Sequence, residues 1–365
     1  MAVGDRVADA RTESGLTQAQ LASAIGLDRS ALAKIETGVR RVSAVELVSI
    51  ARELRRRVEW FVEPSPPAIV SYRLTKDGRE TQSIDAELDR IVHDVDFVSG
   101  QCPSLMEHRP DELEPPTSMA EAEALATQAR SLLDLPPDMP ALDLAELVAA
   151  IGLMPFSLHL DGDADAGTVL LGAGGVTVIN GDLHVGRRRL ALAHELGHYL
   201  IADPYTTDWR AGAPGAELLE AYLDRFARAL LLPRVDLEER WSTWVAAPHE
   251  SLRDAAVRAG SHYRVDMTTL ARRLSELEAI DGSQVESIRN VRTRRADIIE
   301  KNLVVPLELE PVALPRVYER AVLSLYRSET ISEDRALGLL LDTMEPADLP
   351  DLPMRPRNEI WVVTS

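Results

Sequence analysis

The sequence His194-Glu195-Leu196-Gly197-His198 constrains this chain more strongly than any other feature. In an α-helix, residues four positions apart lie one turn apart on the same face, so the two histidines would project side by side. Two imidazoles in this arrangement can bind one Zn²⁺ ion, and the glutamate between them is placed to accept a proton from water bound to that ion. The apolar spacing of residues 187–201 favours a helix here. We therefore predict that His194 and His198 bind zinc and that Glu195 acts as general base.

A catalytic zinc site needs a third protein ligand, because three ligands leave the fourth position open for water. The helix predicted over residues 217–232 offers Glu217, Glu220 and Asp224. Glu220 and Asp224 are four residues apart and share a face. This gluzincin-like spacing favours Glu220 as the third ligand, with Glu217 as the alternative. Asp224 is then expected to hydrogen-bond the other ring nitrogen of a histidine ligand.

Three consecutive arginines, Arg187 to Arg189, start the helix that carries the two histidines. Their charge opposes the helix dipole, which favours negative charge at this end. We interpret them as the solvated start of the helix, and contact with an acidic loop of a substrate is the alternative.

Residues 16–38 carry a second pattern, in which two short amphipathic helices are separated by a turn at Gly26. A capping box is predicted at the start of the first helix, from Thr17 and Gln20, and at a later helix, from Ser43 and Glu46. The second of these helices begins with polar residues, among them Arg29 and Ser30, and Lys34 follows one turn later. A recognition helix places such positions at base edges in the major groove of DNA. Gln18 starts the preceding helix, where its amide and the helix dipole can reach a phosphate.

The distribution of charge separates this segment from the rest of the chain. The whole chain has 59 acidic against 40 basic residues, a net charge of −19, which would repel nucleic acid. Residues 1–60 instead contain ten basic and eight acidic residues. The acidic excess therefore lies entirely beyond residue 60, and the N-terminus differs electrostatically from the rest of the chain.

Residues 3–62 closely resemble the XRE (Cro-type) helix-turn-helix family. The resemblance rests on LTQAQLASAIGLDRSALAKIETG and on VRRVSAVELVSIARELRRRVEWFV, which is similar to the last two helices of the family. It implies that residues 1–65 bind operator DNA, with base contacts from Arg29, Ser30 and Lys34 and phosphate contacts from Gln18 and Arg40. A domain that has lost DNA binding or that mediates dimerisation is one alternative, and a domain that binds a protein is another.

Residues 118–240 resemble the ImmA/IrrE family of zinc metallopeptidases. The resemblance rests on GTVLLGAGGVTVINGDLHVGRRRLALAHELGHYL and on EAYLDRFARALLLP. In the second motif Glu220 matches the first acid of the family, but Tyr222 stands at the second acid and Asp224 replaces an asparagine, which puts the third ligand in question. The resemblance implies a zincin-like α+β domain with a short sheet from residues 153–160, 168–171 and 176–180. It also implies cleavage of an XRE-type repressor or an antitoxin, in a stress response or beside a toxin–antitoxin locus.

Together these observations predict a mostly helical α+β protein. Residues 1–65 form an all-α helix-turn-helix domain, and residues 66–117 form a linker with a short strand and a helix. Residues 118–240 form the zinc peptidase domain. Residues 241–365 form a helical C-terminal region with a docking or sensor role, and a helical cap on the peptidase core is the alternative.

The predicted function is that of a DNA-associated regulatory metallopeptidase with a protein substrate, working alone or as a homodimer. Zinc is the expected metal, and manganese and iron are the alternatives. The longest apolar run is too short to span a membrane and the N-terminus lacks the apolar stretch of a signal peptide, so a cytoplasmic location without membrane contact is expected. The competing interpretation is a non-catalytic regulator or antitoxin with a structural or vestigial zinc site. The presence of Glu195 argues against it, because a structural site has no use for that carboxylate.

Overall fold

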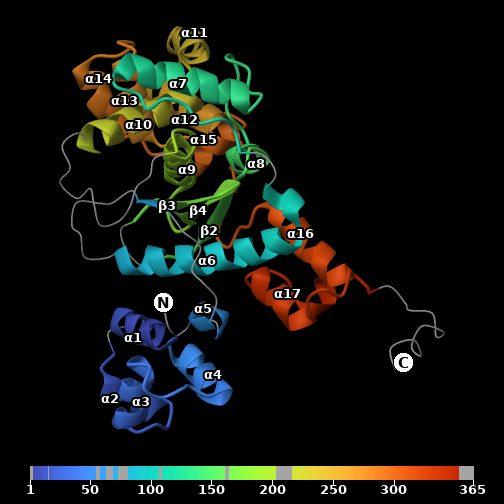
Figure 1. The fold of residues 1–365 in the computed structure, drawn as a ribbon. Helices are drawn as coiled ribbons and strands as arrows, with labels where there is room; N and C mark the ends of the chain where they lie inside the picture. The colour runs from blue at the N-terminus through green and yellow to red at the C-terminus, as the bar shows by residue number, and fades with distance from the viewer. Residues whose placement is uncertain are drawn as a thin grey trace.

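The computed structural model describes residues 3–14, 16–54, 58–62, 69–72, 81–106, 109–160, 164–202 and 216–352 (Figure 1). Within these ranges helices predominate and four strands form one small sheet, which confirms the predicted α+β class. The buried apolar side chains of these residues form three cores, one among the N-terminal helices and one on each face of the sheet. No helix in the described ranges is long and apolar enough to cross a membrane.

The N-terminal helices begin and end where local sequence places them. Thr17 and Ser43 each form a capping box with the residue three positions later, as their sequence pattern predicts. Gly26 and Gly38 follow two of the helices with φ of +70°, a conformation that side chains rarely adopt. The helices are α1 (Val3–Glu13), α2 (Gln18–Ala24), α3 (Arg29–Glu36), α4 (Ala44–Glu53) and α5 (Val58–Val62). Their core is built from residues such as Val7, Leu21, Leu32, Ile50 and Phe61.

The sheet has the strand order β1-β3-β4-β2. Its strands are β1 (Ile69–Tyr72), β2 (Leu153–Leu158), β3 (Ala166–Leu171) and β4 (Gly174–Asn180). Strands β2, β3 and β4 lie where the sequence analysis expects a short sheet; β3 and β4 pair antiparallel as a hairpin, while β2 pairs with β4 in parallel. Every residue of β2, β3 and β4 is buried, so both faces of the sheet must be covered by helices.

One face of the sheet is covered by α6 (Thr81–Gln101), which belongs to the stretch assigned to a linker by the sequence. Its apolar side packs on the sheet in one core with residues such as Phe156 and Val178. Four prolines in the sequence favour a linker before residue 117: Pro103 begins the short helix η1 (Pro103–Met106), and Pro110, Pro115 and Pro116 follow it. The residues after η1 pass to the other face of the sheet, where the backbone N–H of Leu113 donates a hydrogen bond of 2.9 Å to the backbone oxygen of Leu200.

The other face of the sheet is covered by α9 (Val185–Leu200), and α10 (Ala216–Leu231) packs on α9 (Figure 1). Around this pair lie α7 (Met119–Leu132), α8 (Leu144–Ala150), α11 (Arg234–Val245), α12 (Leu252–Tyr263), α13 (Met267–Glu276), α14 (Gly282–Arg289) and α15 (Arg295–Glu300). Helix α9 is therefore enclosed between the sheet and a helical layer.

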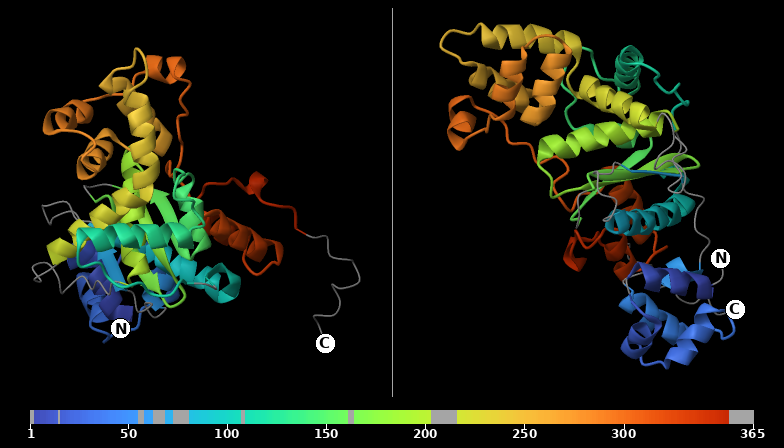
Figure 2. Two further views of the ribbon diagram at one scale, coloured as in Figure 1. Left: turned by 90° about the horizontal axis from the view of Figure 1, so that it is seen from above. Right: turned by 90° about the vertical axis from the view of Figure 1, so that its left-hand side faces the viewer.

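The C-terminal region is divided between the two faces of the sheet. Helices α11 to α14 share the core of α9 and α10. Helices α16 (Arg316–Arg327) and α17 (Glu333–Leu339) lie on the opposite face and share a core with α6 (Figure 2). The predicted region 241–365 thus contributes to two separate cores.

The segment between α15 and α16 connects the two faces and binds the start of α9. Ala313 forms two backbone hydrogen bonds of 2.9 Å with Ser157 of β2. The side chain of Glu308 forms an ion pair with Arg189, and the backbone oxygen of Glu308 accepts a hydrogen bond of 3.1 Å from Arg188. Arg188 and Arg189 are buried, so their interpretation as solvated is wrong. Their partner lies more than a hundred residues later, where local sequence cannot reveal it.

Candidate functional site

Helix α9 holds the two histidines of the motif in the interior, with exposed fractions of 1% for His194 and 2% for His198. Gly197 lies between α9 and α10. A Cβ atom at this position would stand 3.0 Å from the side chains of Leu223 and Phe226. The glycine therefore allows α10 to approach the face of α9 that carries the histidines.

This approach brings Glu220 of α10 onto the two histidines. The Nε2 atoms of His194 and His198 are 3.2 Å apart. The Glu220 carboxylate lies 3.1 Å from Nε2 of His194 and 3.5 Å from Nε2 of His198. The three donor atoms lie within 4.8 Å of one another, so they converge on one point.

The donor set fits a divalent transition metal. Two imidazole nitrogens and one carboxylate are the donors that a catalytic zinc site uses, with one position left open. Two nitrogens bound tetrahedrally at 2.0–2.1 Å would stand about 3.3 Å apart, close to the 3.2 Å between His194 and His198. Among the described residues, His194, His198 and Glu220 form the group of acidic and histidine side chains whose donor atoms lie close enough together to hold a metal ion.

The ionisation of Glu220 suits a metal ligand. Burial raises its pKa, but hydrogen bonds and positive charge from His194 and His198 outweigh burial and lower the pKa below the ordinary range for a glutamate. Glu220 is therefore a carboxylate at neutral pH. Glu217, the alternative ligand, is exposed in the first turn of α10 and is not part of the cluster.

The outer nitrogen of His194 faces a carboxylate. Oδ1 of Asp224 lies 3.2 Å from Nδ1 of His194, the arrangement that fixes the ring of a metal ligand. Arg228 lies one turn further along α10, and its Nη1 atom is 3.9 Å from Oδ2 of Asp224. No motif in the sequence indicated this arginine. The sequence offers one hint of this contact, the spacing of four residues between Asp224 and Arg228 in a helix.

Glu195 completes the group around the motif. Its side chain is fully buried and follows His194 directly in α9. It is not among the three residues whose donor atoms converge, which leaves its carboxylate for a role other than metal binding.

The predicted base-contacting residues of the helix-turn-helix are accessible. Arg29, Ser30 and Lys34 are exposed, with Arg29 and Ser30 at the start of α3. Asp28 occupies the N-cap position of α3, but its side chain does not accept a hydrogen bond from the first N–H groups of the helix. The start of α3 therefore presents positive charge and backbone donors to a negatively charged partner.

The two predicted phosphate contacts are engaged within the domain. Nε2 of Gln18 donates a hydrogen bond of 2.7 Å to Glu36, which also pairs with Arg11. Nη2 of Arg40 donates to Glu46 at 2.6 Å. To contact a phosphate, Gln18 and Arg40 would have to divide their N–H groups between the phosphate and these two glutamates.

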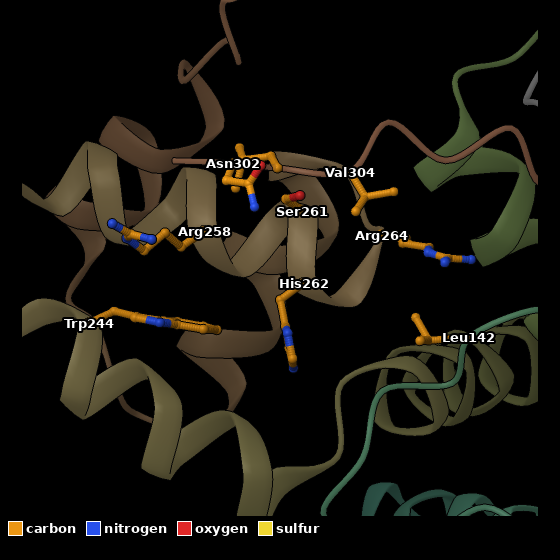
Figure 3. A pocket seen from close by; sticks show the side chains of 9 residues that line it. Leu142, Trp244, Arg258, Ser261, His262, Arg264, Asn302 and Val304 are labelled. Atoms are coloured by element: carbon orange, nitrogen blue, oxygen red, sulfur yellow. The ribbon is translucent and has the colours of Figure 1, made fainter. Parts of the chain in front are cut away.

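A separate pocket of about 310 Å³ lies beside α12 and the residues that follow α15. Figure 3 shows Arg258 and Arg264 on opposite sides of it, with His262 between them. Arg258 is bound by Glu250 at 2.9 Å, and Arg264 by Asp143 at 3.1 Å. The described residues that line this pocket include neither a carboxylate nor a thiol. The histidine motif is therefore a better candidate than this pocket for hydrolytic chemistry.

Comparison with known proteins identifies two segments. Residues 7–61 match the helix-turn-helix family model, and residues 153–275 match the model described as the IrrE N-terminal-like domain. The two matches confirm the architecture suspected from the sequence. The second match runs from β2 to α13, so it extends further towards the C-terminus than residues 118–240.

No curated protein matches the chain. One solved structure, of Bacillus thuringiensis PlcR in complex with the peptide PapR7 and DNA, is 14% identical. The match covers 93% of this chain and 95% of that chain, with a TM-score of 0.18, which is too low to indicate a common fold.

Proposed function

We propose that this chain, which joins an XRE-type helix-turn-helix domain to an IrrE N-terminal-like domain, is a DNA-associated regulatory zinc metallopeptidase. It cleaves a partner protein, an XRE-type repressor or an antitoxin, and thereby switches transcription. The observation that carries the proposal is the convergence of His194, His198 and Glu220 on one point, with Glu195 beside them on α9. The two family matches support the link between DNA binding and hydrolysis.

The residues of the site divide the reaction among them. His194, His198 and Glu220 would hold the metal. When bound, the ion would lower the pKa of a water molecule towards neutrality and polarise the scissile carbonyl. Glu195 would act as the general base that takes a proton from the attacking water, and would return that proton to the leaving nitrogen as the C–N bond breaks. Oδ1 of Asp224, which lies 3.2 Å from Nδ1 of His194, would accept a hydrogen bond from it and so leave the lone pair on Nε2 for the metal.

Removal of the metal tests this proposal. We expect elemental mass spectrometry to find one zinc ion per purified chain, rather than manganese or iron. Zinc-loaded protein added to a bacterial lysate should generate a small set of new protein N-termini. A chelator should abolish these cleavages and added zinc should restore them, because the chemistry needs the ion.

Two variants on one helix serve as a matched pair for this experiment. Glu220→Ala should lose zinc because it removes a ligand, whereas Glu217→Ala should keep it because Glu217 is exposed and outside the cluster. Absence of zinc in the wild type would contradict the proposal. One zinc ion per chain with no new N-termini would favour the non-catalytic regulator.

The DNA-binding part is tested at α3. The double variant Arg29→Ala/Lys34→Ala should bind DNA from upstream of the chain's own gene at least tenfold more weakly, because each base contact contributes about 1–3 kcal/mol. Fluorescence anisotropy with labelled duplex at fixed salt concentration measures the effect.

Arg52→Ala is the control for this experiment, since Arg52 is also exposed but lies in the last turn of α4. It should bind the duplex nearly as well as the wild type. Unchanged affinity of the double variant would instead indicate a helix-turn-helix that binds a protein.

A further inference from the structure

A series of charged side chains connects the metal centre to the C-terminal helices. Nδ1 of His194 lies 3.2 Å from Asp224, and the other carboxylate oxygen of Asp224 lies 3.9 Å from Nη1 of Arg228. Nε of Arg228 donates a hydrogen bond of 2.9 Å to Oε1 of Glu276, at the end of α13, and Nη2 lies 2.8 Å from the same oxygen. Three short steps thus lead from a metal ligand to a different helix.

Arg228 is held rigidly in this series. Its exposed fraction is 5%, so solvent screens its charge poorly. One hydrogen bond and a second close contact to Oε1 of Glu276 hold its guanidinium group in place. Glu276 is fixed in turn, because three other arginines contact it: Arg225 at 3.1 Å, Arg272 at 3.7 Å and Arg273 at 3.8 Å.

We propose that Arg228 and Glu276 are positioning residues for the metal ligand His194 and act through Asp224. The guanidinium group attracts one oxygen of Asp224 and so keeps the other oxygen directed at Nδ1 of His194. A hydrogen bond formed across this 3.2 Å contact would fix the orientation of the ring and make its inner nitrogen a better donor. The inference rests on the proposed function only in requiring that the cluster binds a metal.

The chain contains a matched control for Arg228. Arg225 lies one turn earlier on α10 and also contacts Glu276. Its strongest ion pair, of 2.6 Å, is with Glu123 of α7 rather than with Asp224. Substitution of Arg225 therefore disturbs the same arginine–glutamate network without removing the charge beside Asp224.

The test is the zinc affinity of the full-length chain, measured by competition with a chromophoric chelator. Arg228→Gln and Glu276→Gln should each weaken zinc binding by about tenfold, the lower end of the range for partners outside the ligand set. Arg228→Lys should restore most of the loss, because it keeps a cation beside Asp224. Arg225→Gln should bind zinc as the wild type does. Circular dichroism checks that each variant is folded.

A double-mutant cycle separates positioning from general stability. Asp224→Asn alone should weaken zinc binding by about tenfold to a hundredfold. If Arg228 acts through Asp224, then Arg228→Gln should have no further effect in the Asp224→Asn background. Glu276→Gln, in the wild type and in the Asp224→Asn background, provides the same test should Arg228→Gln fail to fold.

Three results would overturn the inference: unchanged zinc affinity of Arg228→Gln, equal losses in Arg228→Gln and Arg225→Gln, or additive losses in the cycle. These results are distinct from failure of the proposed function. A chain that shows the expected zinc affinities but cuts no protein refutes the peptidase and leaves the positioning role standing. A wild type that binds no zinc refutes both.

Discussion

Replacing Glu195 with glutamine is expected to abolish protein cleavage by the zinc-loaded chain without changing its zinc content. Glutamine has nearly the same size as glutamate and can occupy the same buried space beside His194. Its amide cannot accept a proton at neutral pH, so the attacking water would lose its general base. Loss of such a group lowers the rate by about 10²–10⁴-fold. The appearance of new N-termini in a lysate and elemental analysis of the same sample measure both quantities.

Glu217→Gln is the appropriate control for this variant, because it makes the same chemical change at an exposed glutamate of α10. It should retain cleavage and zinc. Full cleavage by Glu195→Gln would exclude Glu195 as the base. Loss of zinc from Glu195→Gln would show that the carboxylate supports the metal. A variant that keeps the full regulatory effect in cells would favour the non-catalytic regulator.

The parts of the molecule that the sequence predicted well depend on short-range spacing. His194 and His198 share a face because they are four residues apart in a helix, and the caps at Thr17 and Ser43 follow from the residues three positions later. Such features are set by helix geometry, whatever the rest of the chain does. The order of residues along the chain is therefore enough to identify the histidine motif and the helix-turn-helix.

The choice between Glu220 and Glu217 needed the structure. Both lie in one helix, and the sequence cannot show the rotation of that helix relative to α9. The contact of Leu223 and Phe226 with Gly197 determines this rotation, and it turns Glu220 towards the histidines. The coupling of Arg228 to Glu276 is likewise a property of packing between helices far apart in the chain.

The packing of α6 and the division of the C-terminal region could not be predicted for the same reason. The amphipathic pattern of residues 83–98 indicates a helix but not the surface that it covers. The prolines after it suggested an extended linker, although the chain needs only short proline-containing segments to pass from one face of the sheet to the other. Long-range partners decide both features, and no local pattern encodes them.

A large loss of stability is expected for Arg189→Met. Arg189 is completely buried, where its guanidinium group pairs with Glu308 and donates a hydrogen bond to the backbone oxygen of Ala141. The substitution would leave a nearly buried carboxylate whose remaining cation, Arg264, is 3.4 Å away. Removing one partner of a buried ion pair costs about 3–5 kcal/mol. The midpoint of urea unfolding, followed by circular dichroism, should fall clearly below that of the wild type.

Arg234→Met provides the comparison, since Arg234 forms an ion pair of similar chemistry with Glu238 on the exposed side of α11. Exposed pairs contribute about 0–1 kcal/mol, so its midpoint should hardly move. Equal shifts for the two variants would contradict the assignment of Glu308 as an internal anchor. A selective loss for Arg189→Met would mean that the segment between α15 and α16 holds the start of α9. Arg188 and Arg189 would then serve the fold, and of the three arginines before the histidine motif only Arg187 would remain exposed to a substrate.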